Sequence, residues 1–486
     1  MRAWFFLAAL VTVPAWAGED SREMNTVSKV WDRYAQASSQ NQEEAASLLS
    51  EASKAHYFFL RDAALYASVE QMRRVPYPDR VLVYALRATQ DLPQLQALAD
   101  GAAVARLCTR EGWCGVASTE NADELPTLAH VTLMEPDEAI GELGPPTGTQ
   151  FQFGPEFVRE DGQWKVKPES LVADESAGIQ AQIARTGMTE NQMLQFLIGH
   201  LLGEKRVAPE LMALERPLID DAAARSRLNE RWPDYKSTYR SRIKAIGVKA
   251  DQGDSFAQFV LGSLLASGSL PEFVAKDEPR GWKMLEQASD AGNSEAAWYV
   301  FMNTMSDKTK YTDATLRRAR VHLQRAASAA KPEAMNALGG FYFEGVGGLA
   351  RDCRQAAQWQ ARAEEAGLAI ARNEQVWTWA TCPIPGQRDP AKAVQLASYM
   401  ASTRDTLAAS ELDTVAAAYA AAGNFAEALV FQKLALDKLD SGTSEVDKQA
   451  VVPTRKRMQA RLRGYGEGRD YVQDYNTFEE IMEGRY

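Results

Sequence analysis

The chain is poor in the residue types that most often carry chemistry. Its 486 residues include four histidines and four cysteines. The sequence contains no His-Glu-x-x-His, Walker A or Gly-x-Ser-x-Gly pattern, which excludes zinc proteases, P-loop nucleotidases and α/β-hydrolases that carry these signatures. We identify no catalytic residue, no metal ligand and no cofactor site, and therefore expect a protein that is not an enzyme.

The chain also has fewer basic than acidic residues. Lys and Arg number 54 against 65 Asp and Glu, which gives a net charge of −11 at pH 7. Proteins that bind nucleic acid need a basic surface to neutralise phosphates. The composition therefore argues against a nucleic-acid partner, and the acidic balance mainly favours solubility.

Long apolar runs are absent from the body of the chain, so we expect no transmembrane segment. The first residues read MRAWFFLAALVTVPAWA, in which Arg2 precedes a short apolar run and the small residues Ala15 and Ala17 flank Trp16. This pattern is typical of a cleaved secretory signal. It predicts a signal peptide over residues 1–17 and an exported protein, periplasmic if the source is Gram-negative.

Two patterns in the chain imitate active-site signatures. Ser241 with Lys244 and Ser328 with Lys331 match the Ser-x-x-Lys of penicillin-binding enzymes, but the accompanying Ser-Asp-Asn and Lys-Thr-Gly are missing. The glycines of GVGGLA, residues 345–350, match a dinucleotide fingerprint yet follow a helical pattern instead of a strand. We interpret the serine matches as accidental and the glycines as serving backbone geometry.

A repeated helical unit dominates the second half of the chain. Small residues that open the first helix of each unit recur at intervals of 39, 38 and 37 residues, at Ala257, Ala296, Ala334 and Ala371. Only Ala or Gly fits where two helices cross closely, and Gly ends a helix in a left-handed conformation. A period of this length is typical of stacked helix pairs.

The third unit is the clearest. It resembles the Sel1-like repeat, a relative of the tetratricopeptide repeat, in the residues Ala334, Leu338, Gly339, Tyr342, Gly345, Asp352, Ala356, Trp359 and Gly367. The likeness covers residues 250–403, and residues 404–440 resemble a tetratricopeptide hairpin. The resemblance implies an all-α solenoid that binds a protein partner, with side chains of successive first helices lining its inner curve.

The cysteines fall into two pairs, Cys108 with Cys114 and Cys353 with Cys382. Cys353 is expected to begin the second helix of one repeat and Cys382 to end the first helix of the next, on faces that touch. In an exported protein this arrangement predicts two disulfides, with free buried thiols as the alternative. The spacing does not fit a zinc site.

The region before the array combines helices with strands. Residues 26–107 have helical periodicity, whereas 127–172 contain four β-forming segments separated by turn residues. This order predicts an α+β domain in which helices cover one face of a curved antiparallel sheet. Its last hairpin, residues 157–166, is similar to the final strands of an NTF2-like cone domain, which would span 25–200. A cone implies a pocket, for which the candidate residues are His56, Tyr57, Tyr66 and Tyr84.

Two further segments lie before and after the repeat array. Residues 205–249 are predicted to form a helical connector or cap for the array, with Trp232, Tyr235 and Tyr239 buried. Residues 441–486 are predicted to form a cap helix and an acidic tail, which either folds back or stays loose.

The function that the sequence indicates is that of an exported scaffold or adaptor for an unidentified envelope protein, in envelope assembly, secretion or polysaccharide export. One alternative is a protein that binds a small ligand or a cell-wall glycan fragment in the cone pocket. A third interpretation is a hydrolase directed at peptidoglycan or a β-lactam.

Overall fold

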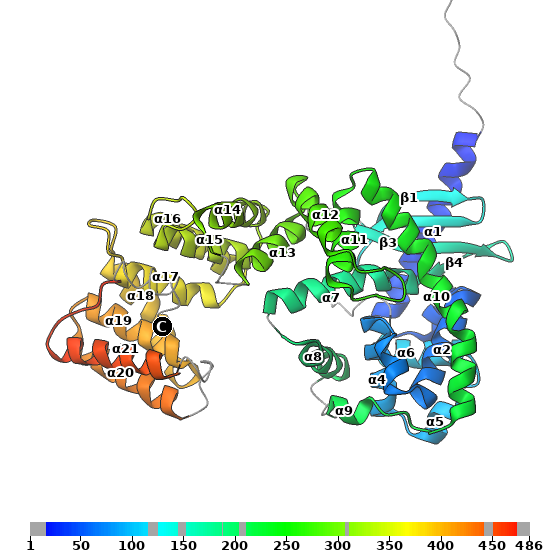
Figure 1. The fold of residues 1–486 in the computed structure, drawn as a ribbon, viewed down its shortest axis with the longest axis horizontal. Coiled ribbons are helices and arrows are strands. Elements are labelled where there is room, and N and C mark those ends of the chain that lie inside the picture. The colour runs from blue at the N-terminus through cyan, green and yellow to red at the C-terminus, as the bar shows by residue number, and fades with distance from the viewer. Residues whose placement is uncertain are drawn as a thin grey trace, which may run out of the picture. The chain divides into compact units, whose positions relative to one another are not determined.

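The computed structural model describes residues 16–114, 125–143, 152–186, 188–203, 210–306, 311–441 and 451–473. The chain forms two compact units, Met1–Ala288 (unit 1) and Ser289–Tyr486 (unit 2) (Figure 1). Residues 1–15 of the predicted signal peptide lie outside the described residues. Within the part of the chain that is described, no helix combines the length and the apolarity needed to cross a bilayer.

Unit 1 begins with helices that start where the sequence supplies caps. Ser50, Ser68 and Asp91 each accept a hydrogen bond from a backbone N–H of the first turn that follows, and Pro78 lies in the first turn of α4. The elements are α1 (Trp16–Ser39), η1 (Glu43–Leu48), α2 (Glu51–Tyr66), α3 (Val69–Arg73), α4 (Tyr77–Thr89), α5 (Leu92–Ala97) and α6 (Gly101–Arg110).

Four antiparallel strands follow in the predicted segments. They are β1 (Leu128–Glu135), β2 (Glu138–Leu143), β3 (Gln152–Glu160) and β4 (Gln163–Lys167), and they pair in the order β1-β2-β3-β4. The hairpin between β3 and β4 turns at Asp161 and Gly162, whose φ angles are 49° and 76°. Asp-Gly favours a two-residue turn with both φ angles positive, so this hairpin forms as predicted.

One face of the sheet packs into the core of unit 1. Its central row of cross-strand partners consists of Leu133, Ala139, Phe157 and Val166. Helix α1 covers this face, and Trp164 of β4 donates a hydrogen bond of 2.8 Å from Nε1 to Glu23 of α1. Helices and meander thus form one α+β unit, as predicted, while the NTF2-like likeness of residues 25–200 stays a prediction.

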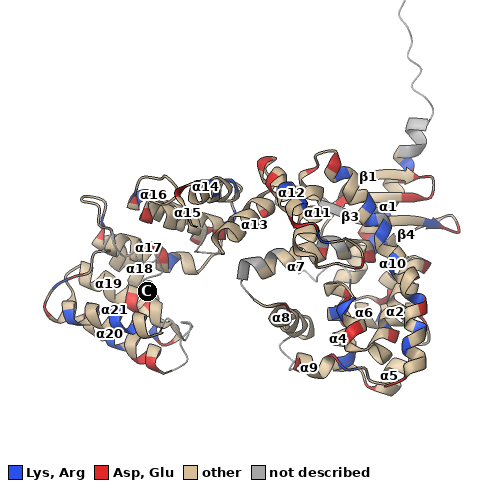
Figure 2. Cartoon of the chain, viewed as in Figure 1, with Lys and Arg blue, Asp and Glu red and all other residues tan. Residues whose placement is uncertain are grey.

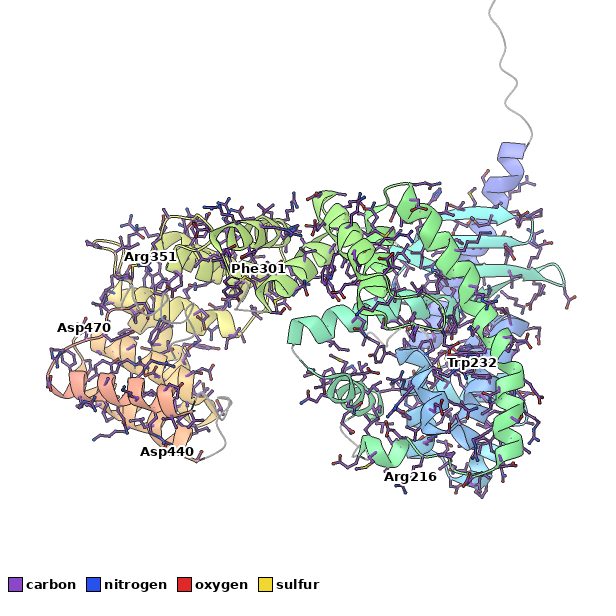
Figure 3. All side chains as sticks on the ribbon, in the orientation of Figure 1. Arg216, Trp232, Phe301, Arg351, Asp440 and Asp470 are labelled. Atoms are coloured by element: carbon purple, nitrogen blue, oxygen red, sulfur yellow. A yellow bond between two sulfur atoms is a disulfide. The ribbon has the colours of Figure 1, made fainter. Side chains whose placement is uncertain are left out.

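The rest of unit 1 is helical. It comprises η3 (Pro168–Leu171), α7 (Val172–Thr186), α8 (Glu190–Leu202), α9 (Leu211–Leu214), α10 (Ala222–Asp251), α11 (Ser255–Ser267) and α12 (Glu278–Asp290). The long helix α10 packs against α2, where Trp232, labelled in Figure 3, lies 5.7 Å from Phe59 between ring centroids. Trp232, Tyr235 and Tyr239 are all buried, as the sequence predicted.

Unit 2 is a stack of antiparallel helix pairs. Its helices are α13 (Ser294–Met305), α14 (Asp313–Ser328), α15 (Pro332–Glu344), α16 (Cys353–Glu365), α17 (Ile370–Thr381), α18 (Pro390–Ala401), α19 (Ala409–Ala421), α20 (Phe425–Asp440) and α21 (Val451–Gly466). Neighbours in the chain pack against one another through this series. The structure therefore confirms a helical repeat region.

The residues of the third repeat occupy positions that explain their types. Ala334, Leu338 and Ala356 are buried in helix contacts. A Cβ on Gly339 would lie 2.9 Å from the carbonyl oxygen of Ala356, so the α15–α16 crossing leaves no room for a side chain there. Tyr342 and Trp359 are half-buried beside the same helices.

The ends of these helices follow the predicted turn chemistry. Gly345 caps α15 with φ of 70°, and Gly367 adopts φ of 94° after α16, which L residues rarely tolerate. Asp352 caps α16 by accepting hydrogen bonds of 3.0 Å from the backbone of Arg354 and Gln355. The glycine-rich loop is thus an inter-helix turn.

Candidate functional site

A buried polar cluster links three helices of unit 1. His56 of α2 lies 3.2 Å from the Asp79 carboxylate of α4, between Nε2 and Oδ1. On α10, Tyr235 donates a hydrogen bond of 2.6 Å to Oδ2 of Asp79, and Tyr239 donates to the same oxygen. The pocket candidate His56 therefore sits within a hydrogen-bonded network that ties α2, α4 and α10 together.

The electrostatics of this cluster favour a charged pair. Burial alone would lower the pKa of His56, but the charge of Asp79 and its hydrogen bond raise that pKa above its ordinary value. For Asp79 burial works to raise the pKa, and it is outweighed by the charge of His56 and by the hydrogen bonds from His56, Tyr235 and Tyr239, which lower it. His56 is only 4% exposed, so this pair holds helices together instead of facing a substrate.

Tyr57, the second pocket candidate, belongs to a neighbouring buried group. Burial raises the pKa of Tyr57 well above its ordinary value, and the nearby charges of Tyr34 and Glu169 add to the shift. Glu169, on η3, is itself buried, and within the described part of the chain neither of its carboxylate oxygens accepts a hydrogen bond. Burial therefore raises the pKa of Glu169 and favours its neutral form.

The other two pocket candidates do not join this cluster. Tyr66 is half-buried ten residues further along α2, about 15 Å away along the helix axis. Tyr84 is buried and burial raises its pKa, while the largest charge effects on it come from Arg80, Glu215 and Arg87. Among the described contacts, neither tyrosine has a hydrogen bond or ring contact with His56. Among the described residues, the four candidates therefore do not form one hydrogen-bonded cluster.

Both predicted disulfides are present. Cys108 pairs with Cys114 and Cys353 with Cys382, with Cα–Cα distances of 5.4 and 6.1 Å. The second bridge joins the start of α16 to the residue that follows α17. Among the described residues, no group of three or more His, Cys, Asp or Glu side chains is placed to hold a metal ion.

A groove of about 360 Å³ lies beside the second disulfide. Arg354 is next to Cys353. Its guanidinium donates a hydrogen bond of 2.7 Å to the carbonyl oxygen of Gly386, and its backbone N–H donates one of 3.3 Å to the side-chain oxygen of Gln387. These bonds hold the loop that follows Cys382 against α16. Trp379 lines the groove together with Arg354.

An aromatic seam continues from this groove along α17 and α18. Lys392 of α18 lies over the ring of Trp379 at 4.7 Å, and Arg372 of α17 lies over Tyr399 of α18 at 4.2 Å. Residues seven apart share a helix face, so these four residues form one line, which we call the α17–α18 seam. Tyr399 is 66% exposed, an unusual state for so large a ring.

The other end of the array is closed by the C-terminal helix. Arg461 of α21 binds both carboxylate oxygens of Asp413 on α19, at 2.9 and 2.6 Å. Residues Leu412 to Ala418 of α19 are all buried. The first helix of this pair therefore offers little exposed surface, contrary to the expectation that each first helix lines an open face.

The chain after α21 folds back on the array as far as it is described. Asp470, labelled in Figure 3, forms an ion pair of 2.6 Å with Arg388, and the backbone N–H of Gln473 donates a hydrogen bond of 2.8 Å to Thr381. Of the two states left open for this region, residues 467–473 adopt the folded-back one. The remainder of the acidic tail lies outside the described residues.

Sequence reasoning missed the seam and the partners of His56. Tyr235 and Tyr239 stand four residues apart, a spacing that puts two hydroxyl groups on one helix face. That spacing was a usable signal for a shared buried acceptor. Trp379 and Tyr399 carry no local signal of exposure, because each falls within an ordinary helical pattern.

Comparisons with known proteins add little. No family model matches the chain, and no curated protein matches it. Among solved structures, the crystal structure of a Sel1 repeat protein from Oxalobacter formigenes is similar, with 21% identity and a TM-score of 0.32. The match covers 46% of this chain and 85% of that one. The repeat architecture of unit 2 is established by its own helix pairs.

Proposed function

We propose that this chain is an exported, non-enzymatic adaptor that holds a protein partner on the helical surface of unit 2. The signal-like N-terminus and two disulfides support export. The resemblance of residues 250–440 to Sel1-like and tetratricopeptide repeats supports protein binding as the task. The partner is an envelope protein, in assembly, secretion or polysaccharide export.

The α17–α18 seam with its groove is the observation that carries this proposal. Trp, Tyr and Arg are the residues that contribute most to protein interfaces, and Tyr399 is largely exposed. The guanidinium of Arg354 donates a hydrogen bond to the carbonyl oxygen of Gly386, and among its described contacts it pairs with no carboxylate. A partner segment with an apolar side chain next to an acidic group matches this surface.

Capture of a partner from an envelope extract tests the assignment. The bait is the mature protein from Gly18, alone or as the variants Tyr399→Ala and Arg354→Glu. Matched controls are Val430→Ala and Arg404→Glu, which alter exposed residues of unit 2 outside the seam. Tyr399→Ala is expected to lose the partner without a change in melting temperature. Arg354→Glu is expected to lose the partner together with a small loss of stability, because it also removes the hydrogen bond to Gly386. The controls are expected to retain the partner. Equal capture by all five proteins would refute the seam as the binding surface.

Export has its own test. The mature N-terminus is expected at or near Gly18, with the protein released by osmotic shock. An intact Met1 on a protein that stays with the cytosolic fraction would contradict export. Ser328→Ala is expected to change neither capture nor stability, because Lys331 is engaged elsewhere, in an ion pair of 2.7 Å with Glu295.

A further inference from the structure

The sheet of unit 1 has a second face, and a cavity of about 570 Å³ lies over it. The C-terminal half of α10 forms the opposite wall of this cavity (Figure 1). Lys249 of α10 forms an ion pair of 2.6 Å with Glu142 of β2, which ties the helix to the sheet. The cavity therefore lies between two elements that are joined, and its volume falls within the range of ordinary small-molecule sites.

The middle of the cavity is apolar on both sides. Side chains alternate between the two faces of a strand, so Ile140 of β2 and Val158 of β3 point away from the core row of the sheet. Both line the cavity floor, and Ala245 and Ile246 of α10 line the opposite wall. An aliphatic chain placed between them would bury apolar surface against the sheet and the helix together.

The mouth of the cavity also has an apolar part. Met134 of β1 and Val248 of α10 line the cavity and are 53% and 50% exposed. Single exposed apolar side chains are common on protein surfaces, whereas those that adjoin a groove are typical of binding sites. The two residues therefore give an apolar ligand a matching entrance.

Among the described residues, the charged side chains inside the cavity are already engaged. Lys167 forms an ion pair of 2.9 Å with Glu156, and Lys249 pairs with Glu142. Arg242, only 1% exposed, also has a partner within the chain. A charged ligand group would therefore find no free opposite charge there, and burying a charge without a partner is costly. The interior thus favours an uncharged ligand.

The rim carries charges of both signs (Figure 2). Glu135 and Glu138 of the sheet and Lys244 of α10 are exposed and line the opening. Glu160, at the end of β3, accepts a hydrogen bond of 3.0 Å from the backbone N–H of Glu51. Exposed charges are screened by water and salt, so the rim contributes little to the choice of ligand.

Thr132 of β1 supplies an uncharged hydrogen-bonding group. It lies opposite Ile140 in the pairing of β1 with β2, and it lines the cavity. Thr132 is half-buried, and among the described contacts its hydroxyl group has no hydrogen-bond partner. A hydroxyl group can both donate and accept a hydrogen bond. Thr132 can therefore pair with a hydroxyl or a carbonyl group of a ligand.

We propose that this cavity binds a free, uncharged, single-chain aliphatic molecule that carries one hydroxyl or carbonyl group. That group pairs with the hydroxyl of Thr132, and the chain lies against Ile140, Val158 and Ile246. Burial of the chain between apolar walls drives binding, and the one hydrogen bond orients the ligand. The site lies wholly in unit 1 and does not depend on the adaptor function proposed for unit 2.

Three probes with the same chain length test the preference for an uncharged ligand. Decanol, decanoate and decyltrimethylammonium are titrated into the mature protein by calorimetry at neutral pH, below their micelle concentrations. Decanol is expected to bind at least about tenfold more tightly than either ion, because neither ion finds an unpaired charge inside the cavity. A smaller ratio, or no saturable binding of decanol, would overturn the proposal.

Two substitutions at Thr132 test the hydrogen bond. Thr132→Val keeps the shape of the side chain, suits a strand and removes the hydroxyl group, so it is expected to weaken decanol binding by roughly three- to tenfold. Thr132→Ser retains the hydroxyl group and is expected to bind decanol within about twofold of wild type. Unchanged affinity in Thr132→Val, or an equal loss in both variants, would refute this hydrogen bond.

Filling the cavity tests its location. Ala245→Phe places a ring in the cavity and is expected to abolish decanol binding. Ala223→Phe makes the same change at an exposed position near the start of α10 and should leave binding unaffected. If circular dichroism shows that Ala245→Phe does not fold, Val248→Trp takes its place, because it narrows the mouth from an exposed position.

Decanol binding that survives the filling variant would refute this site. Association of the protein with phosphatidylglycerol vesicles, without binding of decanol, would do so as well, because the proposal is for a free molecule.

Discussion

Tyr235 on α10 donates a hydrogen bond of 2.6 Å to Asp79 on α4, although 156 residues separate them in the sequence. Asp79 also accepts a hydrogen bond from Tyr239 and lies next to His56 of α2. One carboxylate therefore ties α10 to α2 and α4. The same helix carries Arg242 and Ile246 further along this face, where they line a cavity of about 570 Å³ between α10 and the sheet. The polar cluster therefore fixes the position of α10 relative to α2 and α4.

Unit 1 is expected to lose stability as the pH rises above about 6.5. The pKa of His56 is raised in the folded protein, so its contribution is complete below its ordinary pKa of about 6.5 and fades as pH passes the folded value. The lowered pKa of Asp79 makes the contribution of that carboxyl complete above about 4. The raised pKa of Glu169 adds a penalty in the same direction as pH rises.

Melting of the mature protein between pH 5 and 8.5 measures this trend. His56→Gln can still donate a hydrogen bond to Asp79 but does not titrate, so its melting temperature should depend less on pH. Asp79→Ala removes the shared acceptor and is expected to destabilise unit 1 by roughly 3–5 kcal/mol. Asp137→Asn, at an exposed turn, is the control. A pH dependence unchanged by His56→Gln would show that the pair does not titrate as described.

Unit 2 is expected to respond to pH in the opposite sense. His322 on α14 is buried, and burial together with Arg325 and Arg318 lowers its pKa to about 4. A histidine with a lowered pKa stabilises the fold above its ordinary value of about 6.5 and loses this contribution as pH falls toward 4. The loss amounts to about 3 kcal/mol at most. His322→Gln should keep a bond to Ser289, which lies 2.8 Å from Nδ1, and should remove the acid sensitivity.

The two disulfides are expected to contribute unequally to the free energy of unfolding. Cys353–Cys382 closes a loop of 29 residues and Cys108–Cys114 one of 6. In the chain-entropy model these loops correspond to about 3.6 and about 2 kcal/mol, so Cys353→Ser should lower the melting temperature more than Cys108→Ser does. Calorimetry of both variants measures the difference. Cys353→Ser should also weaken partner capture, because the bridge borders the groove; four free thiols in a non-reducing peptide map would exclude both bridges.

The helix crossing in the third repeat is expected to reject a larger side chain. Ala356 is fully buried where α15 and α16 cross, so Ala356→Leu should overpack the contact and destabilise unit 2 by roughly 1–3 kcal/mol. Ala391→Leu, at an exposed position of α18, is the matched control and should change stability by less than about 0.5 kcal/mol. Urea unfolding of both variants gives the comparison, and equal midpoints would contradict the tight crossing.

Local chemistry predicted much of the fold. The Asp161-Gly162 turn and the caps at Asp352 and Gly345 depend on residues that are neighbours in the chain, so the sequence alone was enough to locate them. The pairing of Cys353 with Cys382 followed from the repeat period, because the period fixes which helix ends touch. His56 was correctly singled out as unusual, but its partners come from α4 and α10, and no local rule links those helices.

The sequence by itself determined the helices, the strands and the helical repeat, because capping, turns and periodicity act over a few residues or one repeat length. The tertiary structure alone decided which side chains meet. It placed Asp79 beneath two tyrosines, exposed Tyr399 beside Arg372, and joined Arg242 to Lys167 in one cavity. These contacts arise from the packing of elements far apart in the chain, where the burial of apolar surface sets the geometry and the polar groups must find partners within it.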